Sequence, residues 1–346
     1  MEYSVSFPGG AVRYVHHTHF SGINEVLTPA NTIVMTDSNV ARLHGDLFKK
    51  FKAVITIPAG EANKNHTTIL SLIQQLMEQK VHRKTFLLGV GGGVVTDITG
   101  FVAAIYMRGL RFGFVPTTLL GMVDASIGGK NGINIGLQKN MVGTIQQPEF
   151  ILFDNDMLAT LPDEEWSNGF AEVIKAACLF DNKLFDELAE NNIKYYQQNS
   201  PALSALIAKS VDWKNKIVLA DERENGIRKL LNFGHTSGHA FETVCHIPHG
   251  QAIAVGMLVA CKISEQYGLD KNVTERLHTL LQQYNLPVSI HADTDEVMNV
   301  LMLDKKRDNY GVDFIILNSI GNAEIKNIEF DVIKNAIDAF THAGDN

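Results

Sequence analysis

Apolar and polar positions follow two alternating periods over the first 160 residues. Segments such as 66–80 repeat apolar positions at helical spacing. Between such segments, short apolar runs predict buried strands at 31–36, 53–57, 85–90, 112–116 and 150–154. Strands that alternate with helices are typical of βαβ units with a parallel sheet. The pattern therefore predicts an α/β domain over residues 1–160.

The pattern changes after residue 160. The segment "LPDEEWSNGFAEVIKAACLF" begins with proline and acidic residues, which favour the start of a helix. An apolar run at 313–318 is compatible with one strand. The other periodic segments are helical, at 201–220, 235–245, 250–267, 271–284 and 329–341. We therefore expect a mainly α-helical domain over 161–346, with a ligand site in the cleft between the two domains, because such clefts are preferred binding sites.

Composition narrows the class of protein. The net charge of −8 argues against a general nucleic-acid binder, which would carry a basic footprint. Three cysteines without a C-x-x-C pair argue against a disulfide framework and favour a reducing cytosol. The N-terminus lacks the basic start and apolar core of a signal peptide. The longest apolar run, 252–261, is shorter than the roughly 20 residues that a membrane span needs, so we expect a buried core helix in a cytoplasmic protein.

A glycine cluster follows the third predicted strand. The segment "GVGGGVVTDITG" (89–100) leads from this strand into a helix, which is the setting of a dinucleotide phosphate loop. From Gly91 it nearly matches G-x-G-x-x-G, but Thr96 takes the third glycine position. A tight strand–helix turn without a ligand is the alternative. The loops "TDSN" (36–39) and "PAGEANK" (58–64) also follow strands, and the three together favour a nucleotide site.

Two further segments place charged residues in unusual settings. The glycine-rich segment 126–143 contains Lys130, Lys139 and Asn140, which suit an anion, although a solvated loop is the alternative. In "GFAEVIKAACLF", Glu172 and Lys175 lie three apart in an apolar helix, and such charges are costly to bury without partners. They form either an internal ion pair or a metal ligand next to an anion contact.

The segment "NFGHTSGHAFETVCHIPHG" (232–250) concentrates the histidines of the chain. Its members with ligand chemistry are His235, His239, Cys245, His246 and His249. The first two are four apart and share a helix face, as in H-E-x-x-H zinc proteases, but threonine replaces the proteolytic glutamate. With Glu172 they are compatible with a Glu/His/His catalytic zinc site. Spacing alone leaves open which two histidines bind and whether the cysteine is a ligand.

Two charged clusters complete the pattern. The first precedes the histidines and contains Lys214, Lys216, Glu224, Arg228 and Asn232. The second is "LDKKR" at 303–307. Either cluster is an ordinary charged helix face or a set of substrate contacts.

Taken together, these segments resemble the 3-dehydroquinate synthases of the sugar-phosphate cyclase family. The likeness covers nearly the whole chain and is strongest in "GGGVVTDITGF", "RGLRFGFVPTTLLGMVDASIGGK", "KNMVG", "GFAEVIK", "DERENGIRKLLNFGH", "GHAFE" and "HGQAIAVGM". It implies a Rossmann-like NAD-binding domain, a helical metal-binding domain and a homodimer. The implied reaction, in the shikimate pathway, is a carbon–oxygen lyase step that converts 3-deoxy-D-arabino-heptulosonate 7-phosphate into 3-dehydroquinate and phosphate. The implied cofactors are NAD, reduced and reoxidised in each turnover, and zinc or another divalent ion such as cobalt.

The resemblance also assigns roles to residues. Zinc would bind Glu172, His235 and His249, whereas His239 and Glu224 would transfer protons, and Lys130, Lys175 and Asn140 would join them in catalysis. Substrate would contact Arg108, Asp124, Lys130, Asn140, Lys175, Lys214, Arg228, Asn232, His239 and Lys305. NAD would contact Asp37, Asn39, Gly60, Glu61, Lys64, Gly93, Val94, Val95, Thr96, Asp97, Thr117, Thr118, Lys139, Met157, Leu158, Ala159 and Thr160.

Some positions depart from the common family pattern without touching a proposed ligand. They are Thr96, Asn131, the segment "IGLQKN" and Gln251. A cyclase that forms an inosose or valiolone ring is the nearest alternative, but Arg228 and Asn232 keep the pattern expected for a substrate carboxylate. A metal- and NAD-dependent alcohol dehydrogenase would need fewer cations. A non-enzymatic binding module would not need acid–base residues such as Glu224 and His239.

Overall fold

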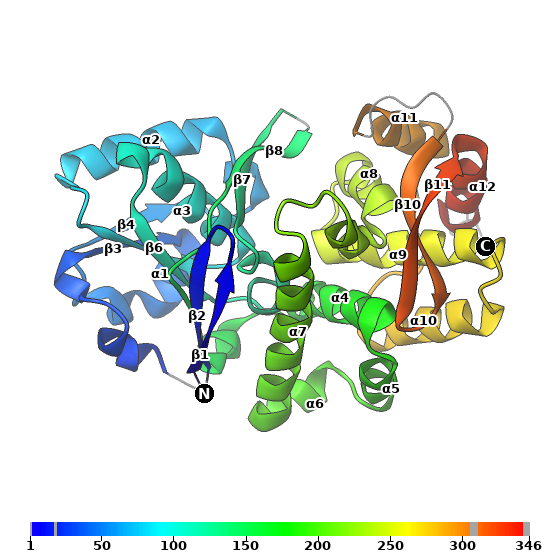
Figure 1. Cartoon of the computed structure of the whole chain (residues 1–346), viewed down its shortest axis with the longest axis horizontal. Helices are drawn as coiled ribbons and strands as arrows, with labels where there is room; N and C mark the ends of the chain where they lie inside the picture. The colour runs from blue at the N-terminus through cyan, green and yellow to red at the C-terminus, as the bar shows by residue number, and fades with distance from the viewer. Residues whose placement is uncertain (1, 17–18, 137, 305–310, 342–346) are drawn as a thin grey trace. The chain divides into compact units, whose positions relative to one another are not determined.

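The computed structural model describes residues 2–16, 19–136, 138–304 and 311–341 (Figure 1). The chain divides into two compact units. The first comprises Met1–Pro162 and Ser200–Arg223, and the second comprises Asp163–Asn199 and Glu224–Asn346. The expected division into 1–160 and 161–346 differs from these units by two residues at the boundary and by the segment 200–223, which packs with the first unit.

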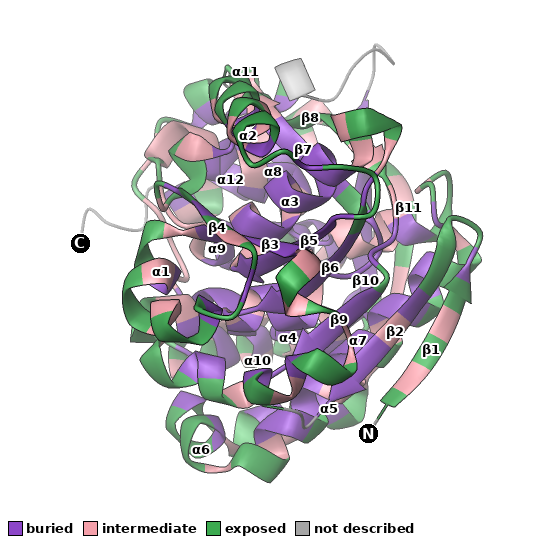
Figure 2. Cartoon of the chain, turned by 90° about the vertical axis from the view of Figure 1, so that its left-hand side faces the viewer, coloured by how far each residue is buried: buried purple, intermediate pink, exposed green. Residues whose placement is uncertain are grey.

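A seven-stranded sheet forms the centre of the first unit. Its order is β1 (Glu2–Phe7), β2 (Gly10–His16), β9 (Phe150–Phe153), β6 (Arg111–Pro116), β5 (Phe86–Gly91), β3 (Thr32–Asp37) and β4 (Ala53–Ile57). Only the β1–β2 pair is antiparallel. The five strands predicted from apolar runs are confirmed, and Figure 2 shows the central strands in the colour of buried residues. The apolar runs are continuous because both faces of a parallel sheet are covered.

Helices α2 (His66–Glu78) and α3 (Gly93–Ile105) lie on one side of this sheet, and α1 (Ser38–His44) lies on the other (Figure 1). Side-chain caps start two of them. The Asp37 carboxylate accepts hydrogen bonds from the first amides of α1, and Asn65 Oδ1 accepts one from the amide of Thr68 in α2. A hairpin of β7 (Lys130–Ile135) and β8 (Gln138–Ile145) packs on α3.

Short helical turns connect these elements. In the first unit they are η1 (Phe20–Glu25), η2 (Pro29–Asn31), η3 (Gly45–Phe48), η4 (Glu61–Asn63), η5 (Tyr106–Arg108), η6 (Gly121–Ala125) and η7 (Asn155–Thr160). Several of them follow the carboxyl ends of parallel strands, so they line one edge of the sheet.

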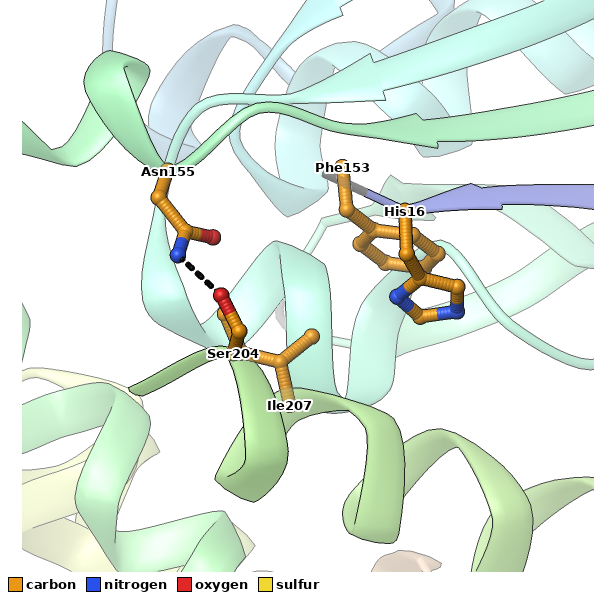
Figure 3. A pocket seen from close by; sticks show the side chains of 5 residues that line it. All are labelled: His16, Phe153, Asn155, Ser204 and Ile207. Atoms are coloured by element: carbon orange, nitrogen blue, oxygen red, sulfur yellow. Dashed lines mark hydrogen bonds between the residues drawn. The ribbon is translucent and has the colours of Figure 1, made fainter. Parts of the chain in front are cut away.

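Helix α7 (Ser200–Ala220) belongs to the first unit through polar contacts along its length. Near its start, Asn155 Nδ2 donates a hydrogen bond to Ser204 Oγ at 2.7 Å, beside a hollow that His16, Phe153 and Ile207 also line (Figure 3). Further along, Asn215 Oδ1 accepts a hydrogen bond from the Tyr14 hydroxyl at 2.7 Å. These contacts join α7 to β2 and to the end of β9.

The second unit is mainly helical. It contains α4 (Asp163–Phe180), α5 (Asn182–Glu190), α6 (Ile193–Gln198), η8 (Ile227–Asn232), α8 (His235–Cys245), α9 (His249–Glu265), α10 (Lys271–Gln283), α11 (Thr294–Asp304), β10 (Gly311–Ser319), β11 (Asn322–Glu329) and α12 (Phe330–Thr341). The α9 helix packs against α4, α8, α10 and α12. Its segment 252–261 is buried throughout, which confirms the predicted core helix. Among the residues that the structure describes, no helix is long and apolar enough to span a membrane.

Helices α8 and α9 approach closely because glycine forms their contact. A Cβ atom at Gly256 would lie 2.0 Å from the carbonyl oxygen of Gly234, a distance that no side chain tolerates. Gly234 itself has a φ of +77°, in the left-handed region that favours glycine. His235 begins α8 directly after this residue, and His249 begins α9. The glycine contact thus sets the spacing of the helices that carry these histidines.

Candidate functional site

Three side chains from three helices of the second unit converge. Glu172 projects from the buried part of α4, and its Oε1 lies 3.6 Å from Nε2 of His235 and 3.4 Å from Nε2 of His249. The potential ligand atoms all lie within 4.8 Å of one another. Oε2 of Glu172 forms an ion pair with the buried Lys175 ammonium, whereas Oε1 faces the two imidazoles. A buried carboxylate facing two imidazole nitrogens fits a divalent metal, and three protein ligands leave a position open.

Each of these imidazoles has an oxygen near its other ring nitrogen. Nδ1 of His235 lies 3.2 Å from the carbonyl oxygen of Phe233. Nδ1 of His249 lies 3.2 Å from Oε2 of Glu242. An acceptor near Nδ1 favours the tautomer with hydrogen on Nδ1, which leaves the lone pair of Nε2 free to bind a metal. In both rings this Nε2 atom faces Glu172.

Nearby charges and burial shift the pKa values of Glu172, His235 and His249. Burial alone raises the pKa of its carboxyl, but the nearby Lys175 ammonium and His249 outweigh burial and hold the pKa below its usual range. Burial, together with Lys175, lowers the pKa of His235 well below its usual value. Burial opposes protonation of His249 as well, but Glu172 and Glu242 raise its pKa to about 9. The first two groups are therefore ready to bind a metal at neutral pH, whereas a metal would displace a proton from His249.

The structure places His239 beside these residues. Its ring centroid lies 5.1 Å from that of His235 and 6.0 Å from that of His249. His239, Glu242 and His249 form a second group whose ligand atoms lie within 4.8 Å of one another. In that group, however, the carboxylate already contacts Nδ1 of His249. Cys245 and His246 belong to neither group of described residues, and Cys245 Sγ lies 3.9 Å from the carbonyl oxygen of His291.

Several predicted substrate residues lie in the same unit. The η8 segment packs against α4, and it contains Arg228, which is buried, and Asn232. Nδ2 of Asn232 donates a hydrogen bond to Glu224 Oε1 at 2.8 Å. Glu224 has a φ of +61°, a left-handed conformation that is uncommon for this residue type. Lys305 lies outside the described residues.

The predicted nucleotide residues of the first unit gather at one edge of its sheet. The chain leaves β3 toward β4 on one side and leaves β5 toward β6 on the other, so the strand order reverses between β3 and β5. The crevice at such a switch point is the usual dinucleotide site of open α/β sheets. Asp37 ends β3, and Gly93 begins α3 directly after β5. A Cβ at Gly91 would lie 2.5 Å from the Val95 side chain, which explains the glycine at this turn.

Thr96 is accommodated inside α3. Its side chain is buried, and its hydroxyl donates a hydrogen bond to the carbonyl oxygen of Gly93 at 2.9 Å. The hydroxyl is thus satisfied by the backbone of its own helix. Gln251 also departs from the common family pattern. Its Nε2 donates a hydrogen bond to Glu164 Oε1 at 3.1 Å.

Lys64 links three of the predicted segments. Its Nζ lies 2.5 Å from Asp97 Oδ2 in α3 and donates a hydrogen bond to Asn140 Oδ1 in β8 at 2.6 Å. Burial raises the pKa of Asp97, and Lys64 opposes this shift. The other predicted cofactor residues follow parallel strands or lie in the hairpin: Asn39 in α1, Gly60 and Glu61 after β4, Val94 and Val95 in α3, Thr117 and Thr118 after β6, Lys139 in β8, and Met157, Leu158, Ala159 and Thr160 in η7.

Besides Asn140, four predicted substrate residues belong to the first unit. Lys214 of α7 donates hydrogen bonds to Asp124 in η6, to its carboxylate at 2.7 Å and to its carbonyl oxygen at 2.6 Å. Lys130 is exposed at the start of β7. Arg108, exposed after α3, has a φ of +65°. The structure therefore pairs two residues that the sequence marked separately, 90 positions apart.

Comparison with known proteins identifies relatives that cover most of the chain. Residues 54–168 match the family described as 3-dehydroquinate synthase N-terminal, and residues 169–307 match 3-dehydroquinate synthase C-terminal. A 3-dehydroquinate synthase of Nitratiruptor sp. is 39% identical over 310 residues, covering 87% of this chain and 88% of the relative. That of Saccharolobus solfataricus is 42% identical over 289 residues, covering 81% of this chain and 82% of the relative.

Solved structures share the fold. A 2-epi-5-epi-valiolone synthase from Streptomyces hygroscopicus, with NAD⁺ and Zn²⁺ bound, has a TM-score of 0.87 and 25% identity, covering 98% of this chain and 97% of that structure. A 2-deoxy-scyllo-inosose synthase in complex with carbaglucose-6-phosphate, NAD⁺ and Co²⁺ has a TM-score of 0.85 and 24% identity, covering 97% of this chain and 99% of that structure. The family models span both units and the relatives exceed one-third identity over most of the chain, so this protein belongs to the 3-dehydroquinate synthase family.

Proposed function

We propose that this protein converts 3-deoxy-D-arabino-heptulosonate 7-phosphate into 3-dehydroquinate and inorganic phosphate. Family membership over both units supports this reaction. The observation that carries it is the convergence of Glu172, His235 and His249, with the imidazole of His239 beside them. This arrangement combines a cation site with a proton-transfer group, as the reaction requires.

The proposed cofactors are NAD and a divalent metal, as in the valiolone synthase structure with NAD⁺ and Zn²⁺. Glu172, His235 and His249 would hold the metal, which supplies Lewis-acid polarisation of substrate hydroxyls when bound. The switch-point edge of the first unit would hold NAD, which takes up and returns electrons within one turnover. The net reaction therefore needs no external oxidant.

Proton transfer falls to His239 and Glu224 in this proposal. Oxidation of a substrate carbinol makes the neighbouring C–H acidic, and loss of that proton expels phosphate with the bonding electron pair. An imidazole is suited to move protons near neutral pH, and His239 lies one helical turn beyond His235. Asn232 donates a hydrogen bond to Glu224, which orients this carboxylate.

Cations would bind the two anionic ends of the substrate. A guanidinium matches a planar carboxylate with two parallel hydrogen bonds, so Arg228 suits the substrate carboxylate. An ammonium acts as a point charge toward phosphate. In this role we place Lys175, Lys130 and Lys214, with Arg108 and Lys305 as further contacts. The need to bind both a phosphate and a carboxylate would explain these cations in a protein whose net charge is −8.

A phosphate-release assay tests the function directly. Purified protein with NAD and Zn²⁺ should release one phosphate for each 3-dehydroquinate formed from the seven-carbon substrate. The alternative is another sugar-phosphate cyclase, since inosose- and valiolone-forming enzymes share the fold. Turnover of a sugar 6-phosphate, with none of the seven-carbon acid, would favour this alternative. Net accumulation of NADH from a simple alcohol would instead indicate a dehydrogenase.

Assembly and location are further parts of this proposal. We expect a homodimer, as the family resemblance implies, and light scattering of the purified protein would measure its mass. We also expect a cytoplasmic protein, since its three cysteines are free. Fractionation of the producing cells would test this expectation.

A further inference from the structure

We propose that Glu242 is a positioning residue that orients the ligand His249 for metal binding. The inference rests on the proposed metal site and adds a residue that the sequence pattern did not single out. Glu242 lies on α8, and its side chain is buried. Its Oε2 lies 3.2 Å from Nδ1 of His249, which belongs to the next helix, α9.

The imidazole of His249 spans two carboxylates. Nδ1 faces Glu242, and Nε2 lies 3.4 Å from Oε1 of Glu172. If Nδ1 donates its hydrogen to Glu242, the lone pair of Nε2 points toward Glu172 and the space where a metal would be shared. A carboxylate acceptor also increases the basicity of the ligand nitrogen, and such partners of metal-bound histidines typically affect metal affinity.

The two histidine ligands are supported differently. A backbone carbonyl, that of Phe233, faces Nδ1 of His235, so no single side-chain replacement removes that acceptor. A side chain performs the same role for His249. Helix α8 thus provides one ligand, His235, and the support of the other ligand on α9. Metal affinity should consequently depend on the register between these two helices, which the contact of Gly234 with Gly256 maintains.

The geometry also defines the competing explanation. His239, Glu242 and His249 could form a ligand group of their own, since their ligand atoms lie within 4.8 Å of one another. Glu242 would then be a ligand and not a support. The arrangement around Glu172 argues against this. Nε2 of His235 and Nε2 of His249 both face the buried Oε1 of Glu172, whereas Glu242 faces Nδ1 of His249.

Metal binding by the purified full chain tests the proposal. Zn²⁺ affinity is measured by competition with a chromophoric chelator, and Co²⁺ absorption reports coordination. Replacement Glu242→Gln keeps the shape and removes the charge, and we expect about 10- to 100-fold weaker Zn²⁺ binding with the same number of ligands in the Co²⁺ spectrum. Glu242→Asp keeps the charge and should lose less. The matched control is Glu265→Gln on α9, which removes a carboxylate paired with Lys262 and should leave affinity unchanged.

Each outcome distinguishes the inference from the function on which it rests. If the unmodified chain fails to bind Zn²⁺ tightly, the proposed metal site fails. If it binds but Glu242→Gln binds equally well, only the positioning role is overturned. If Glu242→Gln and His239→Ala both abolish binding while Glu172→Ala retains it, Glu242 is a direct ligand. The melting temperature of each metal-free variant shows whether it folds, and a purely structural role would lower that temperature without changing the affinity of the folded protein.

Discussion

The side-chain oxygen of Asn134 accepts a hydrogen bond from the backbone N–H of Asn140 at 3.0 Å. Asn140 has a φ of +55°, so this bond stabilises a left-handed conformation at a predicted catalytic residue. The amide of the same Asn134 side chain donates a hydrogen bond to Glu61 Oε1 at 2.7 Å, and its backbone N–H donates one to the carbonyl oxygen of Lys64 at 2.8 Å. Asn134 therefore joins the hairpin to the loop that follows β4.

Replacement of Asn134 by alanine should lower kcat about tenfold. The change removes two side-chain hydrogen bonds and allows Asn140 to leave its orientation. Loss of about 1.4 kcal/mol of positioning energy corresponds to a tenfold lower rate. Steady-state kinetics with the seven-carbon substrate would measure the effect.

The control for this variant is Asn192→Ala. Asn192 Oδ1 accepts a hydrogen bond from the backbone amide of Tyr195 and caps α6, which contains none of the predicted site residues. Its loss should cost about 1 kcal/mol of unfolding free energy without changing kcat. Equal kcat values for Asn134→Ala and Asn192→Ala would refute the positioning role of Asn134.

His249→Ala and His239→Ala should separate metal binding from proton transfer. The first removes a nitrogen that faces Glu172, so the purified variant should contain little zinc after dialysis. The second should keep its zinc and lose about 10²- to 10⁴-fold in kcat, the usual range for a general acid–base group. Metal analysis and kinetics on the same samples would decide. Retention of zinc by His249→Ala together with its loss from His239→Ala would reverse the ligand assignment.

Gly256→Ala should destabilise the second unit. Its added methyl group would overlap the carbonyl oxygen of Gly234, which forces α8 and α9 apart. Overpacking of this kind typically costs about 1–3 kcal/mol, and separation of the helices should also weaken zinc binding. Urea unfolding and chelator competition would measure both effects. Gly45→Ala is the control, because a Cβ at Gly45 meets no atom within 4 Å.

Asp97→Asn should change how stability depends on pH. Burial raises the pKa of Asp97 above the ordinary 3.8, with Lys64 in opposition. The native state therefore binds the Asp97 proton more tightly than the unfolded chain does, and ionisation costs stability. This cost is absent below the unfolded pKa and develops as the pH rises through the native pKa. Asparagine does not titrate, so the unfolding free energy of the variant relative to the parent should increase between about pH 4 and neutrality. A relative decrease over that range would contradict the raised pKa.

The sequence by itself determined the local elements and the chemical types at the site. Continuous apolar runs predicted the buried parallel strands, and helical spacing predicted α7 and α9, because a side-chain period reports the local backbone and its buried face. Ligand chemistry marked Glu172, and the cluster at 232–250 marked the histidines. The spacing of His235 and His239 suggested a shared metal, and only the resemblance pointed instead to His249.

Tertiary structure decided which of these elements meet. Residues 200–223 follow helices of the second unit but pack with the first, through contacts such as that of Lys214 with Asp124. Likewise, Glu242 contacts His249 only because α8 and α9 approach at glycine. Periodicity specifies that a face is buried but not what covers it, since the partner is chosen by packing and polar contacts between residues far apart in the chain. The ligand types were therefore visible in the sequence, whereas the contact of Glu242 with His249, seven positions away, depended on how α8 and α9 pack.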